Sequence, residues 1–276
     1  MNKQYIYFIN GDWVLDSKAT ISFNDLGFLY GDGLFETMRF DNANIFSFDK
    51  HFLRLEKGLH ELSLQTPYDK KTVYRLLNEI IQKNNLNSGI LRLMITRGTQ
   101  NKKINNMIPN LYISIKPFYS IPTKPVKIIF YSENQFPLIR FNPAIKSMNY
   151  LGNMLAKKRC DEDGAYEPAF YNSKNIITEC ALRNIFFLKK NELFTPSLDL
   201  GILSGVMRET ILSIAQSLNL KYHELHINYN KIDDYDEAFI TSTGIGLLPC
   251  YWAGFKSDYK LTSIIKKELF NRINNN

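Results

Sequence analysis

The sequence predicts a mixed α+β protein with two domains. Strand-like hairpins alternate with helical segments, a pattern that favours α+β over a doubly wound α/β sheet. The chain has 276 residues, a length that suits two domains better than one. Pro117 and Pro122 bracket the break between the two runs of elements. We therefore expect a small N-terminal domain over residues 1–118 and a larger C-terminal domain over residues 119–276.

The N-terminal domain is predicted to start with a β-hairpin and to carry two helices. Asn10 and Gly11 form a strong two-residue hairpin turn between strand-like runs. A strand is expected over residues 34–40, where apolar and polar residues alternate. Asp49 is a suitable N-cap for the first helix, whose apolar residues recur on one face. The remaining elements are a helix over residues 71–83, strands over residues 90–96 and 111–116, and a loop over residues 97–101.

The C-terminal domain is predicted to contain three helices and several short strands. The first helix spans residues 149–163, and we expect its Leu151, Met154 and Leu155 to be buried. The other two helices span residues 205–218 and 264–273. The strands are expected over residues 126–131, 168–171, 176–178, 185–188, 192–194, 220–225 and 238–241, with a glycine-rich loop over residues 242–246.

The composition excludes several classes of protein. A hydrophobic share of 45% and a charged share of 22% are those of a soluble globular protein. No apolar run approaches the roughly 20 residues of a membrane span, and the start of the chain has no secretion signal. Cys160, Cys180 and Cys250 are far apart, which argues for a reducing cytoplasm and against disulfides or a metal site. The net charge of +7 forms no basic block interleaved with aromatics, so we expect no nucleic-acid partner.

Lys146 is the first candidate catalytic residue. It has apolar neighbours in sequence, including Ile145 and Met148. Apolar surroundings disfavour the ammonium form, and the neutral amine that results is the nucleophile that Schiff-base chemistry needs. Most lysines are surface residues, however, and composition alone favours that simpler interpretation.

Glu179 and the start of the helix at Gly205 are two further candidates. Glu179 stands in an uncharged strand-like run, where it is either a paired edge carboxylate or a group that keeps a pyridine nitrogen protonated. The free N–H groups of Val206 and Met207, with the helix dipole, would favour an anion such as a phosphate. Helix N-termini are common, so this signal alone is weak. Arg54 could reach a phosphate with two hydrogen bonds, although it could equally be a surface charge.

The order and spacing of these residues resemble the signature of the class IV aminotransferases, the fold-type IV enzymes that use pyridoxal phosphate. The signature contains an acidic residue, small, asparagine and aromatic residues at fixed spacing, a threonine, and a glycine followed three positions later by a basic residue. Here these are Glu179, Ala181, Asn184, Phe186, Thr195, Gly205 and Arg208. The segments around Lys146 and Arg54 are similar to the family's Schiff-base lysine segment and phosphate-arginine helix. Residues 30–36 are similar to its N-terminal motif.

The resemblance implies a role for each matching position. Lys146 would hold the cofactor covalently and later move a proton, and Glu179 would contact the pyridine nitrogen. The phosphate would be held by Arg54, Val206, Met207 and Thr243. Tyr150 would lie near the cofactor, and the substrate would meet Tyr30, Arg92, Gly244 and Ile245. Family members have two domains with the cofactor between them and are usually homodimers.

The chain departs from the family pattern at a few positions. Met207 stands where many relatives have a threonine, so a hydroxyl contact to phosphate is lost. Cys180 and Ala181 replace the commoner Gly-Ser, and Arg183 is unusual beside Asn184. These departures affect details of the cofactor contacts and leave the family resemblance intact.

The resemblance leaves three reactions open. The Arg-x-His element of D-amino-acid transaminases is missing from residues 100–103. Branched-chain transaminases are usually longer and carry Phe-Glu-Gly, where this chain has Phe35-Glu36-Thr37. The compact length and the N-terminal motif are more similar to the aminodeoxychorismate lyases, which eliminate pyruvate to give 4-aminobenzoate for folate biosynthesis. We therefore favour the lyase, with an amino-acid transaminase of branched-chain type as the alternative. A catalytically silent relative that binds the cofactor is a further one.

Overall fold

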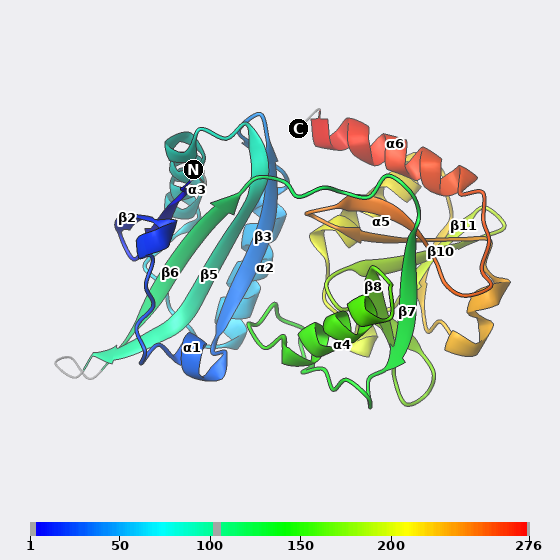
Figure 1. The fold of residues 1–276 in the computed structure, drawn as a ribbon, viewed down its shortest axis with the longest axis horizontal. Helices are drawn as coiled ribbons and strands as arrows, with labels where there is room; N and C mark the ends of the chain where they lie inside the picture. Colours follow the sequence, from blue (N-terminus) through cyan, green and yellow to red (C-terminus); the bar gives the residue numbers. More distant parts are fainter. Residues whose placement is uncertain (1–3, 102–105, 275–276) are drawn as a thin grey trace. The chain divides into compact units, whose positions relative to one another are not determined.

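The structure is a computed structural model that describes residues 4–101 and 106–274. The chain divides into two compact units. They comprise Met1–Tyr119 with Ile145–Asn149, and Ser120–Ala144 with Tyr150–Asn276. Each unit combines a sheet with helices (Figure 1), so the predicted α+β class is confirmed. The five residues around Lys146 belong to the first unit, although the chain on both sides of them belongs to the second.

The first unit is built on an antiparallel six-stranded sheet with the order β2-β1-β6-β5-β3-β4. The strands are β1 (Ile6–Ile9), β2 (Asp12–Leu15), β3 (Gly33–Asp41), β4 (Asn44–Ile45), β5 (Ser88–Asn101) and β6 (Asn106–Lys116). The turn at Asn10 and Gly11 joins β1 to β2 as predicted, because both residues adopt the positive φ that such a hairpin turn requires.

Two helices cover one face of this sheet (Figure 1). They are α2 (Phe48–Glu61) and α3 (Lys70–Asn84), and their apolar faces pack on β3, β5 and β6 in one core. The prediction that Asp49 caps the first helix is wrong, because α2 already begins at Phe48, one residue before Asp49. Its N-cap is Ser47 in a left-handed conformation. Asp49 lies in the first turn, where its negative charge interacts favourably with the helix dipole.

A short helix, α1 (Leu26–Tyr30), precedes β3. Its N-cap Asp25 is fully buried and accepts hydrogen bonds from the backbone N–H groups of Gly27 and Phe28. The same carboxylate accepts hydrogen bonds from the side chains of Thr96 and Tyr112. Burial raises the pKa of Asp25, but the hydrogen bonds to its carboxylate lower the pKa by more than burial raises it, so the net shift is downward. Asp25 therefore fixes the N-terminal motif to the sheet.

The prediction of a loop over residues 97–101 is wrong. Strand β5 continues through this stretch to Asn101, and β6 pairs with it along the same length. Gly98 adopts a φ of +76°, and the register shifts between Thr96 and Thr99. The glycine thus marks a β-bulge within a long strand, a position at which sequence patterns resemble those of loops.

The second unit is built on an eight-stranded mixed sheet with the order β12-β11-β10-β13-β14-β7-β8-β9. Its strands are β7 (Val126–Ser132), β8 (Glu167–Tyr171), β9 (Ile177–Cys180), β10 (Asn184–Lys189), β11 (Glu192–Pro196), β12 (Tyr222–Leu225), β13 (Glu237–Ser242) and β14 (Gly246–Tyr251). Seven of these match predicted strands, and β14 was not predicted. It follows the glycine-rich turn and pairs with both β13 and β7.

Three helices accompany this sheet: α4 (Leu151–Glu162), α5 (Val206–Ser217) and α6 (Lys260–Asn274). The prediction that Leu151, Met154 and Leu155 are buried is wrong, because their exposed fractions are 74%, 50% and 51%. Helix α4 instead buries the small residues Ala156 and Cys160, which let it lie close to the sheet. Its larger apolar residues form an outward-facing stripe. None of the described helices is long and apolar enough to cross a membrane.

Candidate active site

Lys146 lies in a short extended segment that pairs with β3 in the first unit. The N–H of Phe35 donates to the carbonyl of Lys146, and the N–H of Met148 donates to the carbonyl of Gly33, both at 3.0 Å. Ser147 forms the antiparallel bridge partner of Leu34 between these bonds. The register places Lys146 directly opposite Phe35, so both side chains project from the same face. The Lys146 Nζ lies 4.4 Å from the centroid of the Phe35 ring.

Arg92 contacts the same aromatic ring. It projects from β5, where it is the register partner of Thr37, two residues beyond Phe35 on the same face of β3. The Arg92 guanidinium carbon lies 4.2 Å from the centroid of the Phe35 ring. Arg92 is exposed, whereas Phe35 is 6% exposed. One buried ring therefore supports two cations, an amine and a planar guanidinium, on the face of the sheet opposite to α2 and α3.

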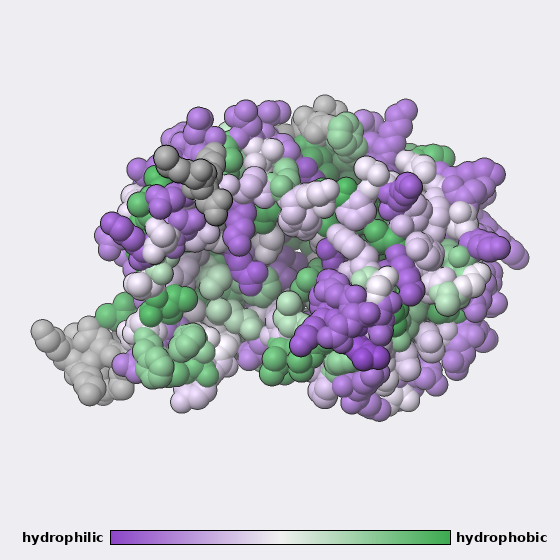
Figure 2. Space-filling view, viewed as in Figure 1, coloured by the Kyte–Doolittle hydropathy of each residue, from purple (hydrophilic) through white to green (hydrophobic). Residues whose placement is uncertain are grey.

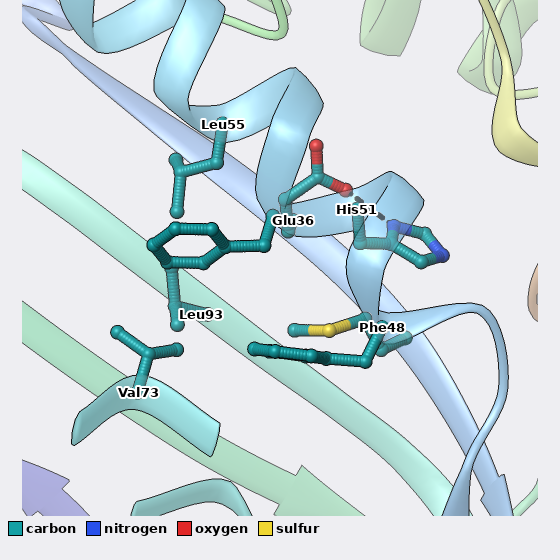
Figure 3. A pocket seen from close by; sticks show the side chains of 8 residues that line it. Glu36, Phe48, His51, Leu55, Val73 and Leu93 are labelled. Carbon is teal, nitrogen blue, oxygen red and sulfur yellow. Dashed lines mark hydrogen bonds and ion pairs between the residues drawn. The ribbon is translucent and has the colours of Figure 1, made fainter. Parts of the chain in front are cut away.

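Figure 3 shows the buried carboxylate of Glu36 beside His51, on the helix-covered side of the sheet. This carboxylate holds Arg54. Its Nε donates to Glu36 Oε1 at 2.8 Å and its Nη2 to Glu36 Oε2 at 2.7 Å, a bidentate pair. His51 Nδ1 lies 2.7 Å from the same Oε2. The sequence prediction named Arg54 but missed both supporting residues. An acidic residue at an inward position of β3 is the signal that could have revealed them, because buried carboxylates need partners.

The electrostatics of this cluster follow from its burial. Burial raises the pKa of Glu36, but the charge and hydrogen bonds of Arg54 and a hydrogen bond from His51 outweigh it and lower the pKa from 4.5 to about 2. Burial lowers the pKa of His51 below 6.5, although Glu36 partly opposes the shift. We infer a charged Glu36–Arg54 pair beside a neutral His51, whose Nδ1–H donates to the carboxylate.

These shifts predict a loss of stability in acid. Between pH 6.5 and the folded-state pKa of His51, the unfolded chain binds a proton that the folded protein does not, so stability falls as pH falls. Below pH 4.5 Glu36 adds a second loss in the same direction, which continues to about pH 2. Urea midpoints measured from pH 7 to pH 3 should decline, with a shallower decline below pH 4.5 in Glu36→Gln. An equal slope for the variant and the wild type would contradict this assignment.

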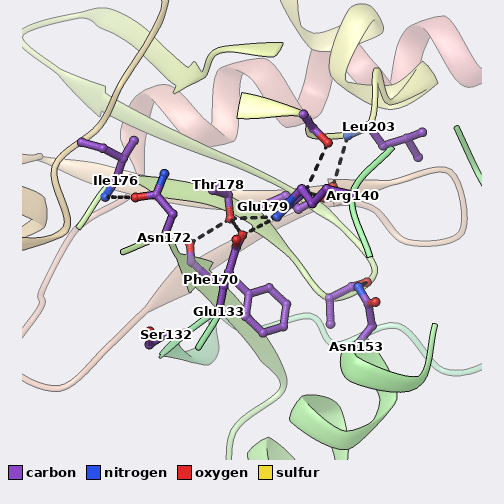
Figure 4. A network of polar contacts seen from close by, with 12 residues as sticks. Ser132, Glu133, Arg140, Asn153, Phe170, Asn172, Ile176, Thr178, Glu179 and Leu203 are labelled. Atoms are coloured by element: carbon purple, nitrogen blue, oxygen red, sulfur yellow. Dashed lines mark hydrogen bonds and ion pairs between the residues drawn. The ribbon is translucent and has the colours of Figure 1, made fainter. Parts of the chain in front are cut away.

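In the second unit, Glu179 is paired with Arg140 (Figure 4). Arg140 Nη1 donates to Glu179, and its Nη2 donates to Glu133 Oε1 at 2.5 Å. The hydroxyl of Thr178 donates to the same Glu133 oxygen at 2.7 Å. Burial lowers the pKa of Arg140, but the charges of Glu179 and Glu133 raise it, with a net shift upward. One guanidinium thus bridges two carboxylates, and sequence reasoning missed both Arg140 and Glu133.

The N-terminus of α5 lies beside the strand that follows Glu179. Its N-cap is Gly205, and a Cβ there would overlap the side-chain amide of Asn184. The Nδ2 of Asn184 donates to the carbonyl and the hydroxyl of Thr241 at 3.0 and 3.1 Å. The asparagine therefore joins the start of α5 to the end of β13. Val206 and Met207 follow as the first residues of the helix, and both are buried.

The other predicted residues of the second unit lie near these elements in the chain. Thr243, Gly244 and Ile245 form the buried turn between β13 and β14, directly after the strand that Asn184 contacts. The Leu203 N–H, in the loop before α5, donates weakly to Glu179 Oε2 at 3.5 Å. The structure thus brings Glu179 close to the loop that leads into α5. Tyr150 is the N-cap of α4.

Two signature positions have structural roles. Arg208 is 2% exposed, and its Nη2 donates to the Pro196 carbonyl and to Glu224. Thr195 donates from its hydroxyl to the carbonyl at position 185. Arg183, which departs from the family pattern, pairs with the fully buried Glu167. These contacts fix the strands that carry Glu179 and Asn184.

Tyr30 is the remaining predicted residue of the first unit. It ends α1 and is 73% exposed. In the first unit, the structure brings together Lys146 and Arg92 on one ring and pairs Arg54 with Glu36. In the second unit, it groups Glu179, the start of α5 and the turn at residues 243–245.

Comparisons with known proteins show the family and the fold of the chain. The family model for amino-transferase class IV matches residues 33–251. A D-alanine aminotransferase of Listeria monocytogenes is 31% identical over 251 residues, which are 87% of this chain and 85% of that protein. The branched-chain amino acid aminotransferase of Escherichia coli has a similar structure, with a TM-score of 0.88 and 21% identity over 98% of this chain and 94% of that one.

A Legionella pneumophila structure, provisionally described as a 4-amino-4-deoxychorismate lyase, is similar to this chain with a TM-score of 0.83. The two sequences are 24% identical, and the match covers 93% of this chain and 97% of the Legionella chain. The structural likenesses show a shared fold. The family model spans most of the chain, and the Listeria relative matches nearly all of it. The chain therefore belongs to the class IV aminotransferases, a family of pyridoxal-phosphate enzymes.

Proposed function

We propose that this enzyme moves a proton on an amino-bearing carboxylate, and that its activity is that of a 4-amino-4-deoxychorismate lyase. The observation that carries the proposal is the placement of Lys146 and Arg92 against one ring, that of Phe35. An amine suited to proton transfer and a guanidinium suited to a carboxylate thus share one face of the sheet. This combination matches a substrate that carries both an amino group and a carboxylate.

The residues present fit pyridoxal phosphate. Its aldehyde suits the amine of Lys146, and its pyridine nitrogen suits the carboxylate of Glu179. Its phosphate suits a guanidinium and a helix N-terminus, which Arg54 and α5 provide. We propose Val206, Met207 and Thr243 as further phosphate contacts and Tyr150 as a neighbour of the ring. When bound, the cofactor supplies an electron sink for the carbon that loses its proton.

The chain's own residues prepare this chemistry in three ways. Arg140 forms an ion pair with Glu179 and so fixes the position of that carboxylate. Glu36 fixes the guanidinium of Arg54 in one orientation through two hydrogen bonds. Phe35 holds the Lys146 amine on the face where it takes and returns a proton. We propose Tyr30, Gly244 and Ile245 as further substrate contacts.

Two activities within the family remain candidates. The segment from Gly31 to Thr37 and the compact chain favour the lyase, which releases pyruvate and 4-aminobenzoate. Relatives named as D-alanine aminotransferases are 27–31% identical to this chain and favour amino-acid transamination as the second candidate. Both reactions begin with removal of a proton by Lys146, so they use the same residues up to that point.

We also propose a homodimer in the cytoplasm. Apolar side chains gather around α1, where Figure 2 shows a hydrophobic surface. They are exposed by 41–76% and comprise Ile21, Phe23, Phe28, Leu29 and Tyr30. Clusters of this kind commonly mark protein–protein interfaces. The outward stripe of α4, with Leu151, Met154 and Leu155, is a second surface of the same character.

A pair of assays tests the proposed function. The purified protein is incubated with pyridoxal phosphate and supplied with 4-amino-4-deoxychorismate, and 4-aminobenzoate is measured. In parallel, D-alanine and branched-chain amino acids are each supplied with 2-oxoglutarate, and glutamate is measured. We expect 4-aminobenzoate from the first reaction. Glutamate without 4-aminobenzoate would replace the lyase by the transaminase. A visible cofactor band with neither product would leave the silent relative that binds the cofactor, and absence of the band would reject the whole proposal.

A further inference from the structure

We propose that Asn149 and Gly33 are positioning residues that hold the Lys146 segment as an added edge strand of the N-terminal sheet. This inference rests on the proposed role of Lys146 and concerns how its side chain is aimed. The five residues from Ile145 to Asn149 group with the first unit, while the chain before and after them groups with the second. The orientation of this segment therefore depends on the contacts that its five residues make with the rest of the first unit.

The first contact is with the open edge of β3. Strand β4 pairs with β3 at Phe40 and Asp41, near its C-terminal end. In the described part of the chain, the lysine segment is the partner on this side at Leu34, near its N-terminal end. Two backbone hydrogen bonds flank the bridge, one to the Lys146 carbonyl and one from the Met148 N–H. A slip of one residue would turn the Lys146 side chain to the opposite face, away from the Phe35 ring.

Gly33 permits this close approach. Its register position is directly opposite Met148. A Cβ at Gly33 would lie 2.8 Å from the Met148 sulfur and 2.7 Å from the Ile95 carbonyl oxygen. A side chain there would push the segment away from β3 or distort β5. The second glycine of the Gly-Asp-Gly motif therefore provides the space in which the lysine segment lies.

Asn149 fixes the end of the segment. Its Nδ2 donates to the carbonyl of Gly31 at 3.2 Å. Gly31 adopts a φ of +68°, and a Cβ there would lie 2.5 Å from Asn149 Oδ1, so the amide packs directly on this residue. The bond sets the register, because it joins the residue after Met148 to the turn that precedes Gly33. Both glycines of the motif thus contact the lysine segment.

The test compares Asn149→Asp and Asn149→Ala with the wild type. Asn149→Asp keeps the shape but replaces the donor by an oxygen that the Gly31 carbonyl repels. Asn78→Asp is the matched control, since the Asn78 side chain donates to the Tyr74 carbonyl on α3 at 2.8 Å, away from the segment. Hydrogen–deuterium exchange of the Met148 amide, read from peptides that cover residues 145–150, reports whether the edge strand stays paired.

We expect exchange at residues 145–150 to be about 2- to 10-fold faster in both Asn149 variants, the range set by one lost hydrogen bond. Exchange elsewhere in β3 and β5 should match the wild type, as should the whole profile of Asn78→Asp. If Asn149→Asp does not fold, Asn149→Ala carries the comparison. Unchanged exchange at residues 145–150 in a folded Asn149 variant overturns the inference.

A second readout separates this inference from the proposed function. Each protein is incubated with pyridoxal phosphate and reduced with borohydride, and mass spectrometry locates the modified lysine. We expect labelling of Lys146 in the wild type and in Asn78→Asp, with a 2- to 10-fold lower rate in the Asn149 variants. Equal rates in all four proteins overturn the inference and leave the function intact. Absence of label at Lys146 in the wild type overturns the function, while the exchange experiment still decides whether the segment is held by Asn149.

Discussion

Lys146→Ala should lose the visible cofactor band and reduce product formation by at least about 10³-fold. The amine is the group that attaches the cofactor and moves the proton, and an alanine does neither. It lies 4.4 Å from the Phe35 centroid, on a segment paired to β3. An alanine keeps the backbone bonds of this segment, so the fold should persist. Absorbance spectra and turnover with 4-amino-4-deoxychorismate and with amino acids measure the two effects.

The matched control for Lys146→Ala is Lys71→Ala. Lys71 is exposed on α3 of the same unit. The control should keep both the band and full turnover. Circular dichroism should be the same for all three proteins. If Lys146→Ala retains the band and turnover, another lysine carries the chemistry, and the assignment built on the lysine segment is wrong.

Glu36→Gln should destabilise the protein by about 3 kcal/mol, because it leaves Arg54 without a counter-charge in a buried site. Glu36 is 1% exposed, and its carboxylate receives two hydrogen bonds from Arg54 and lies against His51. The variant should also lose affinity for pyridoxal phosphate, because the guanidinium proposed for the phosphate loses its fixed orientation. Its affinity for pyridoxal, which has no phosphate, should change less. Urea denaturation and titration of the apoprotein measure these effects.

Glu79→Gln provides the comparison for Glu36→Gln. Glu79 pairs with Arg75 at 2.5 Å on the exposed side of α3. Surface pairs of this kind contribute about 0–1 kcal/mol, so this variant should unfold close to the wild-type midpoint. Equal midpoints for Glu36→Gln and Glu79→Gln would show that the buried pair adds nothing to stability beyond an exposed one.

Local patterns in the sequence predicted most elements of the fold. The hairpin at Asn10, the amphipathic helices of the first unit and the strands around Glu179 all follow from periods of about two or 3.6 residues and from turn residues. Residue chemistry named Lys146 and Arg54 as site candidates, and the family resemblance assigned a role to each. Patterns of this kind predict helices and hairpins because those elements are stabilised by interactions between residues close together in the chain.

The contacts that organise the site join residues far apart in the chain, which explains why the sequence did not predict them. Glu36 pairs with Arg54 18 positions later, and Arg140 reaches Glu179 across 39 positions. The orientation of α4 was predicted wrongly for a related reason. Its apolar residues were assigned to the core, but small residues pack there, and Leu151 faces outward.

The membership of residues 145–149 in the first unit limits how the protein can be divided. A fragment that ends near Tyr119 contains most of the first unit but lacks these five residues. Its β3 would then present unpaired backbone groups from Gly33 to Phe35. Exposed backbone of this kind recruits strands from other molecules, so aggregation is the hazard of such a fragment. A soluble version would need residues 145–149 attached to it by a linker. The first unit is therefore complete only with a segment from the middle of the chain.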